Sequence, residues 1–413
     1  MKKTTKRLLA AGIGLVCVLG ANAASGVKRV NADKGIFQIT TTADFFGDGE
    51  KVTSAIITYK KKIAPDSVSA DDYTVEGKTI QSVAVDGKKV TLFFDCSNIW
   101  EKEFDSGIKA ERDLNNRIPL DVKVTQTGEV TSEDGATIYE AGTAVASANV
   151  SVPKEFKIFD EKIWNDNKTD VEIRYSLYIP ENYGGKNYPL VVFIPDASAN
   201  TNVSKTVLTQ GNGGIIWARP EEQAKHEAIV LAIQYPKYAV DKHGPLVTDD
   251  YQWNQNLQTI YNLIQFIKES FRIDKKRIYG IGQSQGCMAN IAISCKYPNL
   301  YRALWLVAGQ WDADEMAALK DKDMWIVVCE GDQKAYPGMN KAVEKLEENG
   351  ARVAKSQMWN PRSTPEQFDS LVKDMLAQNA NINYTVFEGG NHMYTWSVAY
   401  NIDGIRDWLF SQK

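Results

Sequence analysis

The hydrophobic pattern of the chain changes once, near residue 152, and this change restricts the fold more than any other feature. Between residues 26 and 152, apolar and polar residues alternate with a period of two, as in VTSAIITYKKKI (52–63), IQSVAVDGKKVTLFF (80–94) and IPLDVKVTQTG (118–128). Asp86-Gly87 is typical of a hairpin turn. Helical runs are absent from this half. We therefore predict a small antiparallel, all-β sandwich of immunoglobulin-like size over residues 26–152.

In residues 153–413, strand patterns alternate with amphipathic helical patterns. Segments such as PLVVFIP and AIVLAIQYP have the apolar runs of buried strands. Apolar residues at helical spacing follow, for example at positions 257, 260, 261, 264 and 267. Such an order requires a mostly parallel sheet with helices on both faces. The sequence thus predicts an α/β domain over residues 153–413.

The first residues have the pattern of a secretory signal peptide. Four basic residues precede an apolar stretch from Leu8 to Leu19, and Ala21-Asn22-Ala23 resembles a cleavage site. The apolar stretch is shorter than the ~20 residues that a membrane span needs. We expect residues 1–23 to be removed, the mature chain to have no membrane attachment, and the protein to be secreted or periplasmic.

Charge and cysteine content exclude several classes of partner. Removal of the four basic residues of the signal would change the formal net charge from -4 to -8. Because Lys and Arg do not cluster, we expect no nucleic-acid partner.

The cysteines outside the signal are Cys96, Cys287, Cys295 and Cys329. The last three fall in apolar helix or strand patterns, so we expect buried free thiols, although export permits disulfides. No CxxC or Cys/His spacing indicates a metal site, and we expect neither metal nor cofactor.

The segment RIYGIGQSQGCMAN (277–290) places one serine between two glycines where a predicted strand meets a predicted helix. Gly282-Gln283-Ser284-Gln285-Gly286 matches the G-x-S-x-G nucleophile elbow, in which a sharp turn exposes the serine hydroxyl. Side chains two positions before and after the serine would collide in such a turn, which explains both glycines. A structural serine in an ordinary turn is the alternative, and the motif alone does not exclude it.

A serine nucleophile needs a base, and the chain has three histidines. His226 precedes a predicted strand and His243 lies in a loop, both ahead of the serine. His392 follows the last predicted strand in a glycine-rich loop, from which it can reach the carboxyl edge of the sheet. The orienting acid is expected between serine and histidine, where Asp332 directly follows a strand and Glu330 is the competitor at the strand end. We predict the triad Ser284, Asp332 and His392.

Two further groups of residues are candidates for the site. Main-chain N–H groups of Gln285 and of either Asp196 or Ala197 are expected to stabilise an oxyanion. Tryptophans in loops at the carboxyl ends of the strands are candidates for an aromatic substrate wall, although each one also suits a core position: Trp253, Trp311 and Trp396. Trp359 precedes the capping-box sequence TPEQ (364–367) and is a candidate for a lid, with an ordinary surface helix as the alternative.

The chain resembles the α/β-hydrolase superfamily, and within it the secreted esterases with an immunoglobulin-like N-terminal domain, a group similar to feruloyl esterases and polyhydroxybutyrate depolymerases and often labelled "predicted peptidase". The likeness rests on PLVVFIPDASA, RIYGIGQSQGCMAN, GQWD and NHMYTWSVAY, and more loosely on AIITYKKKIAPDSVSADDYTVEGKTI. It implies a serine ester hydrolase without cofactor that uses Ser284, Asp332 and His392. Two positions depart from the family pattern: Pro195-Asp196 replaces the usual His-Gly of the oxyanion loop, and Cys287 replaces the glycine that often follows the motif.

The function predicted from these features is that of a secreted carboxylesterase acting on short acyl or hydroxycinnamoyl esters, free or linked to polysaccharide. A serine peptidase of the same fold is one alternative, but no subsite for a peptide chain is marked in the sequence. The other is a non-catalytic binding protein on a degraded hydrolase scaffold, which the unusual oxyanion loop would suit.

Overall fold

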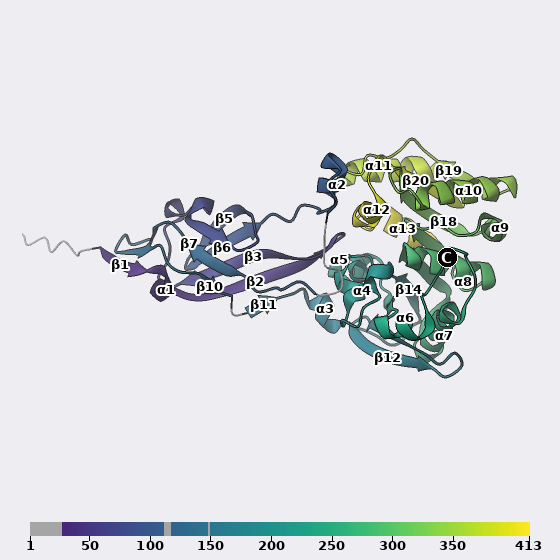
Figure 1. Ribbon diagram of the computed structural model, residues 1–413, viewed down its shortest axis with the longest axis horizontal. Helices are drawn as coiled ribbons and strands as arrows, with labels where there is room; N and C mark the ends of the chain where they lie inside the picture. The colour runs from purple at the N-terminus through teal and green to yellow at the C-terminus, as the bar shows by residue number, and fades with distance from the viewer. Residues whose placement is uncertain (1–26, 111–116, 148) are drawn as a thin grey trace, which may run out of the picture.

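The computed structural model describes residues 27–110, 117–147 and 149–413. The signal peptide predicted for residues 1–23 lies outside the described residues. Figure 1 shows an elongated β-rich first domain and a larger second domain in which helices surround a sheet.

The first domain is built from three small sheets packed around one apolar core. The largest has the order β11-β2-β3-β6-β5, with β2 (Ile36–Phe46), β3 (Gly49–Tyr59), β5 (Ile80–Asp86), β6 (Lys89–Phe94) and β11 (Asn149–Ser151). The others are β1-β9-β8, with β1 (Lys28–Asn31), β8 (Val130–Thr131) and β9 (Thr137–Glu140), and β10-β7-β4, with β4 (Tyr73–Val75), β7 (Lys123–Gln126) and β10 (Val145–Ala146). Alternation along β3 places Ala55, Ile57 and Tyr59 in the core, as a period of two predicts, and a register shift against β2 brings Val52 into the same core. The predicted hairpin is confirmed between β5 and β6, where Gly87 has φ 56°.

Two expectations for this domain were wrong. The strands are not all antiparallel, because β1 pairs with β9, and β11 with β2, in parallel. Helices also occur: α1 (Ala32–Gly35) and α2 (Glu101–Ser106). α2 ends at Gly107, whose φ of 65° suits a left-handed C-cap. Helices this short have too few residues to show a helical period, so the sequence pattern missed them.

The second domain contains one sheet of nine strands in the order β12-β13-β15-β14-β16-β17-β18-β20-β19. An antiparallel edge is formed by β12 (Asp160–Asp166) and β13 (Val171–Tyr178). The parallel part consists of β14 (Tyr188–Ile194), β15 (Ile229–Gln234), β16 (Ile273–Gln283), β17 (Ala303–Val307), β18 (Asp323–Cys329), β19 (Val353–Lys355) and β20 (Ile382–Phe387). β14, β15 and β17 are buried along their whole length because both faces of the sheet are covered.

Helices cover both faces of this sheet, which confirms the predicted α/β architecture. One face packs against α6 (Lys237–His243), α7 (Gln255–Ser270), α8 (Gln285–Lys296), α9 (Ala313–Met316) and α10 (Ala335–Glu348). The other packs against α3 (Lys154–Ile158), α4 (Thr206–Thr209), α11 (Pro365–Leu376), α12 (His392–Ala399) and α13 (Asp403–Ser411). An ion pair between Glu222 and Arg406 joins α5 (Pro220–Lys225) to α13. Since the parallel strands end at one edge, the loops after β14, β16, β17, β18 and β20 meet there.

The first domain contacts the second through α2 and through the end of the β2–β3 hairpin, both of which reach the second domain in Figure 1. The side chain of Trp100 is buried in the apolar core of the second domain. Phe45 stacks on Phe156 with ring centroids 5.3 Å apart, and Asp44 accepts a hydrogen bond from Arg219 at 2.6 Å. Apolar packing and an ion pair therefore fix the hairpin against the second domain.

Candidate active site

Ser284 occupies a sharp turn between β16 and α8. Its φ of 52° and ψ of -119° are strained for a residue with a side chain. A Cβ on Gly286 would lie 1.9 Å from the carbonyl oxygen of Ile194, and a Cβ on Gly282 would lie 2.5 Å from the main chain of Gly286. Both glycines of the motif are therefore required by the close approach of main-chain segments, as the nucleophile elbow predicts.

His392 lies within hydrogen-bond distance of Ser284. Its Nε2 is 2.9 Å from Ser284 Oγ, and its Nδ1 is 2.5 Å from Asp332 Oδ2. His392 is the first residue of α12, which is capped by Asn391 through a bond of 2.8 Å from the N–H of Tyr394. The histidine side chain is 40% exposed, so it can contact a bound molecule.

Asp332 is buried behind the histidine. Its other oxygen, Oδ1, accepts hydrogen bonds from the N–H groups of Lys334 and Ala335 at 3.1 and 2.9 Å. Burial raises the pKa of this carboxyl, but the hydrogen bond and attraction to His392, together with the two main-chain N–H groups, outweigh burial and leave the pKa below its ordinary value. Asp332 is thus held as a carboxylate that orients the imidazole.

The other candidates for base and acid have different partners. Glu330 accepts a hydrogen bond from the N–H of Gly389 at 3.0 Å and supports the glycine-rich loop before His392. His226 binds Glu222 at 2.7 Å and stacks on Phe410. His243 bonds to Gln255 at 3.0 Å. Only the predicted combination of Ser284, Asp332 and His392 is brought together among these groups.

In the loop predicted to form the oxyanion hole, the side chain of Asp196 is buried and hydrogen-bonded. The carboxylate of Asp196 accepts bonds from the N–H of Ser198 at 2.7 Å and from the amide of Gln283 at 2.9 Å, and it is 4% exposed. Its partners therefore hold it beneath the loop. Ala197 opens a short 3-10 turn (Ala197–Ala199), and the first N–H of such a turn has no acceptor within it.

Gln285 is the second predicted donor. It is the first residue of α8, so its main-chain N–H also lacks an acceptor within the helix. Its side chain exchanges two hydrogen bonds with Asn200, at 3.1 and 2.7 Å, and this ties α8 to the loop after β14. The contact between Gly286 and Ile194 brings the same two segments together. The main-chain donors at Ala197 and Gln285 thus lie on adjoining segments beside Ser284.

Two of the predicted tryptophans, Trp396 and Trp311, are buried. Trp396 is 1% exposed and meets the His392 ring edge to face, with centroids 5.0 Å apart. Trp311 is 3% exposed and donates from Nε1 to Glu315 at 2.7 Å. The prediction that they form an open aromatic wall is therefore wrong, because both rings pack inside the domain. Trp396 instead packs against the imidazole ring of His392.

The other two tryptophans lie away from the triad. Trp253 packs against Tyr297 and beneath Lys296, whose Nζ is 4.4 Å from the ring centroid. Lys296 ends α8, roughly 16 Å along the helix axis from the start beside Ser284. Trp359 is 1% exposed, between Trp325 and Phe368. Trp359 is therefore a core residue, and the prediction of a lid lined by it is wrong. Trp253 is partly exposed and lines, with Trp311, a hollow of about 340 Å³, so its contact with a substrate stays a prediction.

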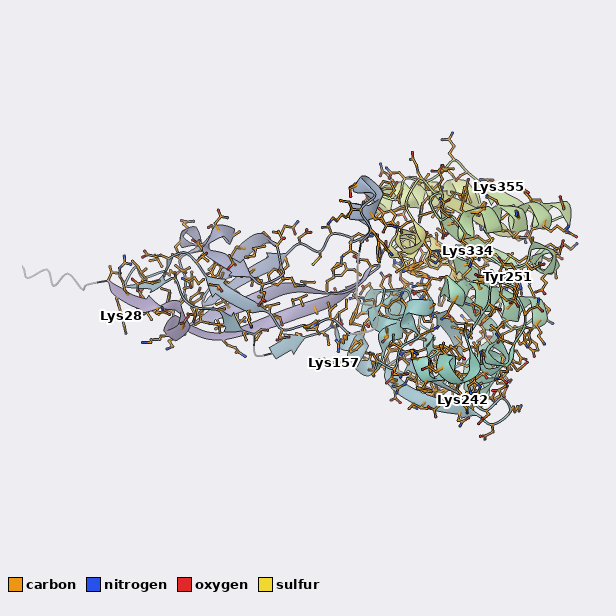
Figure 2. The ribbon with its side chains drawn as sticks, viewed as in Figure 1. Lys28, Lys157, Lys242, Tyr251, Lys334 and Lys355 are labelled. Carbon is orange, nitrogen blue, oxygen red and sulfur yellow. The ribbon has the colours of Figure 1, made fainter. Side chains whose placement is uncertain are left out.

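An aromatic residue at this edge was missed by the sequence analysis. Tyr251 has φ 56°, is partly exposed, and lies against Trp311 with ring centroids 5.3 Å apart. An ion pair between Asp249 and Lys334 joins its loop to the segment that carries Asp332. Figure 2 labels Tyr251 and Lys334 in the second domain. No periodic signal marks this loop, but left-handed backbone at a residue other than glycine is strained and is often found at functional positions.

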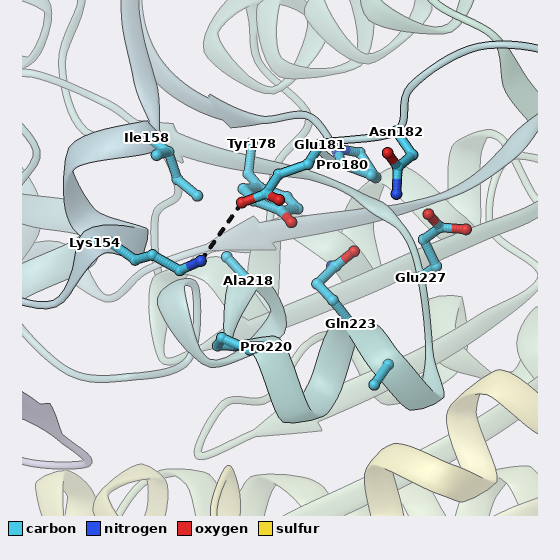
Figure 3. A pocket seen from close by; sticks show the side chains of 11 residues that line it. Lys154, Ile158, Tyr178, Pro180, Glu181, Asn182, Ala218, Pro220, Gln223 and Glu227 are labelled. Atoms are coloured by element: carbon cyan, nitrogen blue, oxygen red, sulfur yellow. Dashed lines mark hydrogen bonds and ion pairs between the residues drawn. The ribbon is translucent and has the colours of Figure 1, made fainter.

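A separate hollow of about 230 Å³ lies between α3, α5 and the segment after β13 (Figure 3). Lys154 Nζ lies 3.5 Å from a carboxylate oxygen of Glu181 at its side, and Tyr178, Gln223 and Glu227 complete much of the lining. None of the three triad residues lines it. It is thus distinct from the candidate active site.

The four cysteines outside the predicted signal are free, as expected. Cys287 and Cys329 are buried, whereas Cys96 and Cys295 are only partly so. Within residues 27–110, 117–147 and 149–413, no cluster of His, Cys, Asp and Glu could hold a metal ion. In the same ranges, no helix combines the length and apolar character that a membrane span needs.

Similarity to known proteins agrees with this architecture. Residues 38–139 match the family model described as the esterase Ig-like N-terminal domain. The chain is similar to the crystal structure of a thermostable esterase, with a TM-score of 0.69 and 22% identity over 91% of this chain and 99% of that one. The fold is that of an α/β hydrolase preceded by an immunoglobulin-like domain. No curated protein matches the chain.

More distant similarities involve other esterases. A ferulic acid esterase from the anaerobic fungus Anaeromyces mucronatus has a TM-score of 0.41 and 14% identity, over 60% of this chain and 89% of that one. An acetyl xylan esterase from Aspergillus awamori has a TM-score of 0.40 and 15% identity, over 60% of this chain and 98% of that one. Both scores are below the level at which a shared fold is established.

Proposed function

We propose that this α/β hydrolase is a secreted serine carboxylesterase that cleaves short acyl or hydroxycinnamoyl esters, such as acetyl or feruloyl groups, on small molecules or polysaccharide. The observation that carries the proposal is the line of hydrogen bonds from Ser284 through His392 to Asp332, built on a strained elbow. The esterase names of the matching N-terminal family and of the thermostable relative support ester substrates.

Acylation begins at the serine hydroxyl. His392 Nε2 takes the proton as Ser284 Oγ forms a bond to the ester carbonyl carbon. The carbonyl oxygen becomes an oxyanion that accepts hydrogen bonds from the main-chain N–H groups of Gln285 and Ala197, each of which contributes on the order of 3 kcal/mol. Asp332 stabilises the imidazolium. When the carbonyl re-forms, the carbon–oxygen bond to the alcohol breaks, and His392 returns its proton to the leaving alkoxide.

Deacylation repeats these steps with water. His392 Nε2 removes a proton from a water molecule whose oxygen attacks the acyl carbon, and the second oxyanion occupies the same two donors. Collapse breaks the bond between the acyl carbon and Ser284 Oγ, and His392 gives the proton to the serine. The carboxylic acid leaves and the free enzyme is restored without a cofactor.

The substrate would bind at the carboxyl edge of the parallel sheet, where Ser284, Asp332 and His392 lie. The partly exposed ring of Tyr251, held against Trp311, offers a flat apolar surface for an aromatic acyl group or a sugar ring. The 40% exposure of His392 leaves room for an alcohol attached to a larger polymer. Export is proposed because residues 1–23 have the pattern of a signal peptide.

The proposal is tested by comparing hydrolysis of an activated acetate ester, a hydroxycinnamoyl ester and the anilide that matches the acetate. We expect ester turnover by the wild type, little anilide turnover, and a loss of about 10⁴-fold or more in kcat in Ser284→Ala. Ser294→Ala is the matched control, because Ser294 is a buried serine of α8 that donates to Asn290 at 2.7 Å. Comparable anilide cleavage would favour a peptidase, and no turnover of any substrate would favour a binding protein.

A further inference from the structure

The first domain contacts the helix that carries the catalytic histidine on two successive turns. Tyr394 and Ser397, three residues apart on α12, share one face of the helix. Tyr394 meets α2, whereas Ser397 accepts a hydrogen bond from Asn98 at 2.7 Å. A Cβ on Gly47, at the end of the β2–β3 hairpin, would lie 1.9 Å from the Ser397 carbonyl oxygen. The first domain thus packs along α12 at main-chain distance.

The contact nearest the histidine is a small cluster around Glu101 of α2. The hydroxyl of Tyr394 donates to one oxygen of Glu101, and Arg362 Nε donates to the other at 2.7 Å. Phe104 lies between these partners, with its ring centroid 5.4 Å from that of Tyr394 and 4.3 Å from the Arg362 guanidinium carbon. Burial, and next the Glu101 carboxylate, raise the pKa of Tyr394, so its hydroxyl stays protonated and acts as donor.

The same cluster limits the loop that leads from β20 to His392. Gly389 and Gly390 both have positive φ, at 59° and 68°. A Cβ on Gly389 would lie 3.0 Å from the ring of Phe104, and a Cβ on Gly390 would lie 2.9 Å from the ring of Tyr394. The loop is therefore in contact with α2 of the first domain on one side and with α12 on the other.

We propose that Glu101 and Phe104 of the immunoglobulin-like domain are positioning residues for His392, acting through Tyr394. The inference rests on the proposed esterase function and adds a role for the first domain in it. The 2.9 Å contact between His392 and Ser284 depends on where α12 begins. Displacement of a catalytic group by about 1 Å can lower a rate by about 10²-fold. The contacts of Glu101 and Phe104 with Tyr394, two residues after His392, restrict such displacement.

Steady-state kinetics of Glu101→Ala, Glu101→Gln and Tyr394→Phe test this role. We expect Glu101→Ala and Tyr394→Phe to lower kcat by about 10-fold with KM within about twofold of the wild type, since the histidine rather than the substrate is displaced. Glu101→Gln retains an acceptor for the Tyr394 hydroxyl, so it is expected to recover most of kcat. Effects of Glu101→Ala and Tyr394→Phe are expected to be less than additive when combined.

Asp44→Asn is the matched control. It removes another ion pair between the domains, to Arg219 on the segment before α5, and is expected to keep the wild-type kcat. Wild-type kcat in Glu101→Ala and Tyr394→Phe would overturn the proposal. The proposal would also be overturned if all variants, including Asp44→Asn, lost kcat and melting temperature to the same extent. The contact between the domains would then contribute only to general stability.

A second readout needs no substrate and separates this inference from the esterase proposal. The proton between His392 Nδ1 and Asp332 Oδ2, which are 2.5 Å apart, should give a far-downfield proton NMR resonance. We expect the resonance to be weakened or lost in Glu101→Ala and Tyr394→Phe and kept in Asp44→Asn. If the first two variants retain it unchanged, the positioning role is overturned whether or not the wild type cleaves esters. If they lose it while no ester is cleaved, only the esterase proposal fails.

Discussion

Asp332 has one oxygen for the histidine and one for the main chain. Oδ2 binds His392, while the N–H groups of Lys334 and Ala335 hold Oδ1. An amide in place of the carboxylate could not stabilise the imidazolium and would present a donor to Nδ1. We predict that Asp332→Asn lowers kcat for an activated ester by about 10³–10⁴-fold.

Glu330→Gln is the control for this prediction. Glutamine keeps an acceptor for the N–H of Gly389, and within the described residues no hydrogen bond links Glu330 to His392, so steady-state kinetics should give nearly wild-type kcat. A large loss of kcat in Glu330→Gln together with a small loss in Asp332→Asn would contradict the assignment of Asp332. It would indicate that Glu330 is the acid that orients His392.

The lowered pKa of Asp332 also predicts a pH dependence of stability. A carboxyl whose pKa is lower in the folded than in the unfolded chain stabilises the fold above its unfolded value, about 3.9, and loses that contribution as pH falls through the lower folded value. We predict that the difference in free energy of unfolding between wild type and Asp332→Asn, measured in urea, is larger at pH 7 than near pH 3. An unchanged or growing difference at low pH would contradict the direction of the shift.

At the scale of elements, the start of α12 combines a structural and a catalytic role. Asn391 caps the helix at the residue before His392. Loss of an N-cap costs about 1 kcal/mol, and here the frayed turn would carry the base. We predict that Asn391→Ala lowers both the unfolding free energy and kcat, and that Asn391→Asp restores most of both.

Thr364→Ala separates these two effects. Thr364 caps α11 with a capping box, so its loss is expected to reduce stability by a similar amount, about 1 kcal/mol, in thermal melts. Because α11 carries no triad residue, kcat should remain near that of the wild type. Equal kcat losses in Asn391→Ala and Thr364→Ala would show that the cap acts only through stability.

The sequence predicted the elements whose pattern is long enough to repeat. The helical spacing from residue 257 to residue 267 lies within α7, and the glycines of the elbow identified the junction of β16 and α8. Chain order and position after strands were sufficient to select Asp332 and His392, since parallel strands bring their following loops to one edge. These parts of the candidate site follow from topology.

Other parts depend on packing that no local pattern encodes. α2 has six residues, less than two full turns, and its contacts lie almost three hundred residues later in the chain. Trp396 was a candidate for a substrate wall and Trp359 for a lid because of the segments in which they lie, but the direction of each side chain decides whether it is exposed or in the core. Tyr251 has a left-handed backbone although it is not a glycine, so its residue type does not predict this conformation.

At the scale of the whole molecule, thiol accessibility tests both the fold and the predicted export. Burial raises the pKa of the Cys295 and Cys329 thiols to about 12, and Cys287 is fully buried. We predict that an alkylating reagent modifies at most Cys96 and Cys295 in the native protein and four cysteines after denaturation.

Intact-mass spectrometry of the exported protein counts these modifications. A fifth modified cysteine would be Cys17 and would show that the predicted signal is retained. Rapid native labelling of Cys287 or Cys329 would contradict the packing of the second domain, because both lie in its core.

The central claim, that Ser284 is a nucleophile activated by His392, is tested most directly by covalent labelling with a fluorophosphonate. Intact-mass spectrometry and peptide mapping should show one adduct, on Ser284, in the wild type. Ser284→Ala should show none, and His392→Ala should react more slowly by about 10³-fold or more. An adduct on another residue would contradict the account. So would labelling of Ser284 in His392→Ala at the same rate as in the wild type.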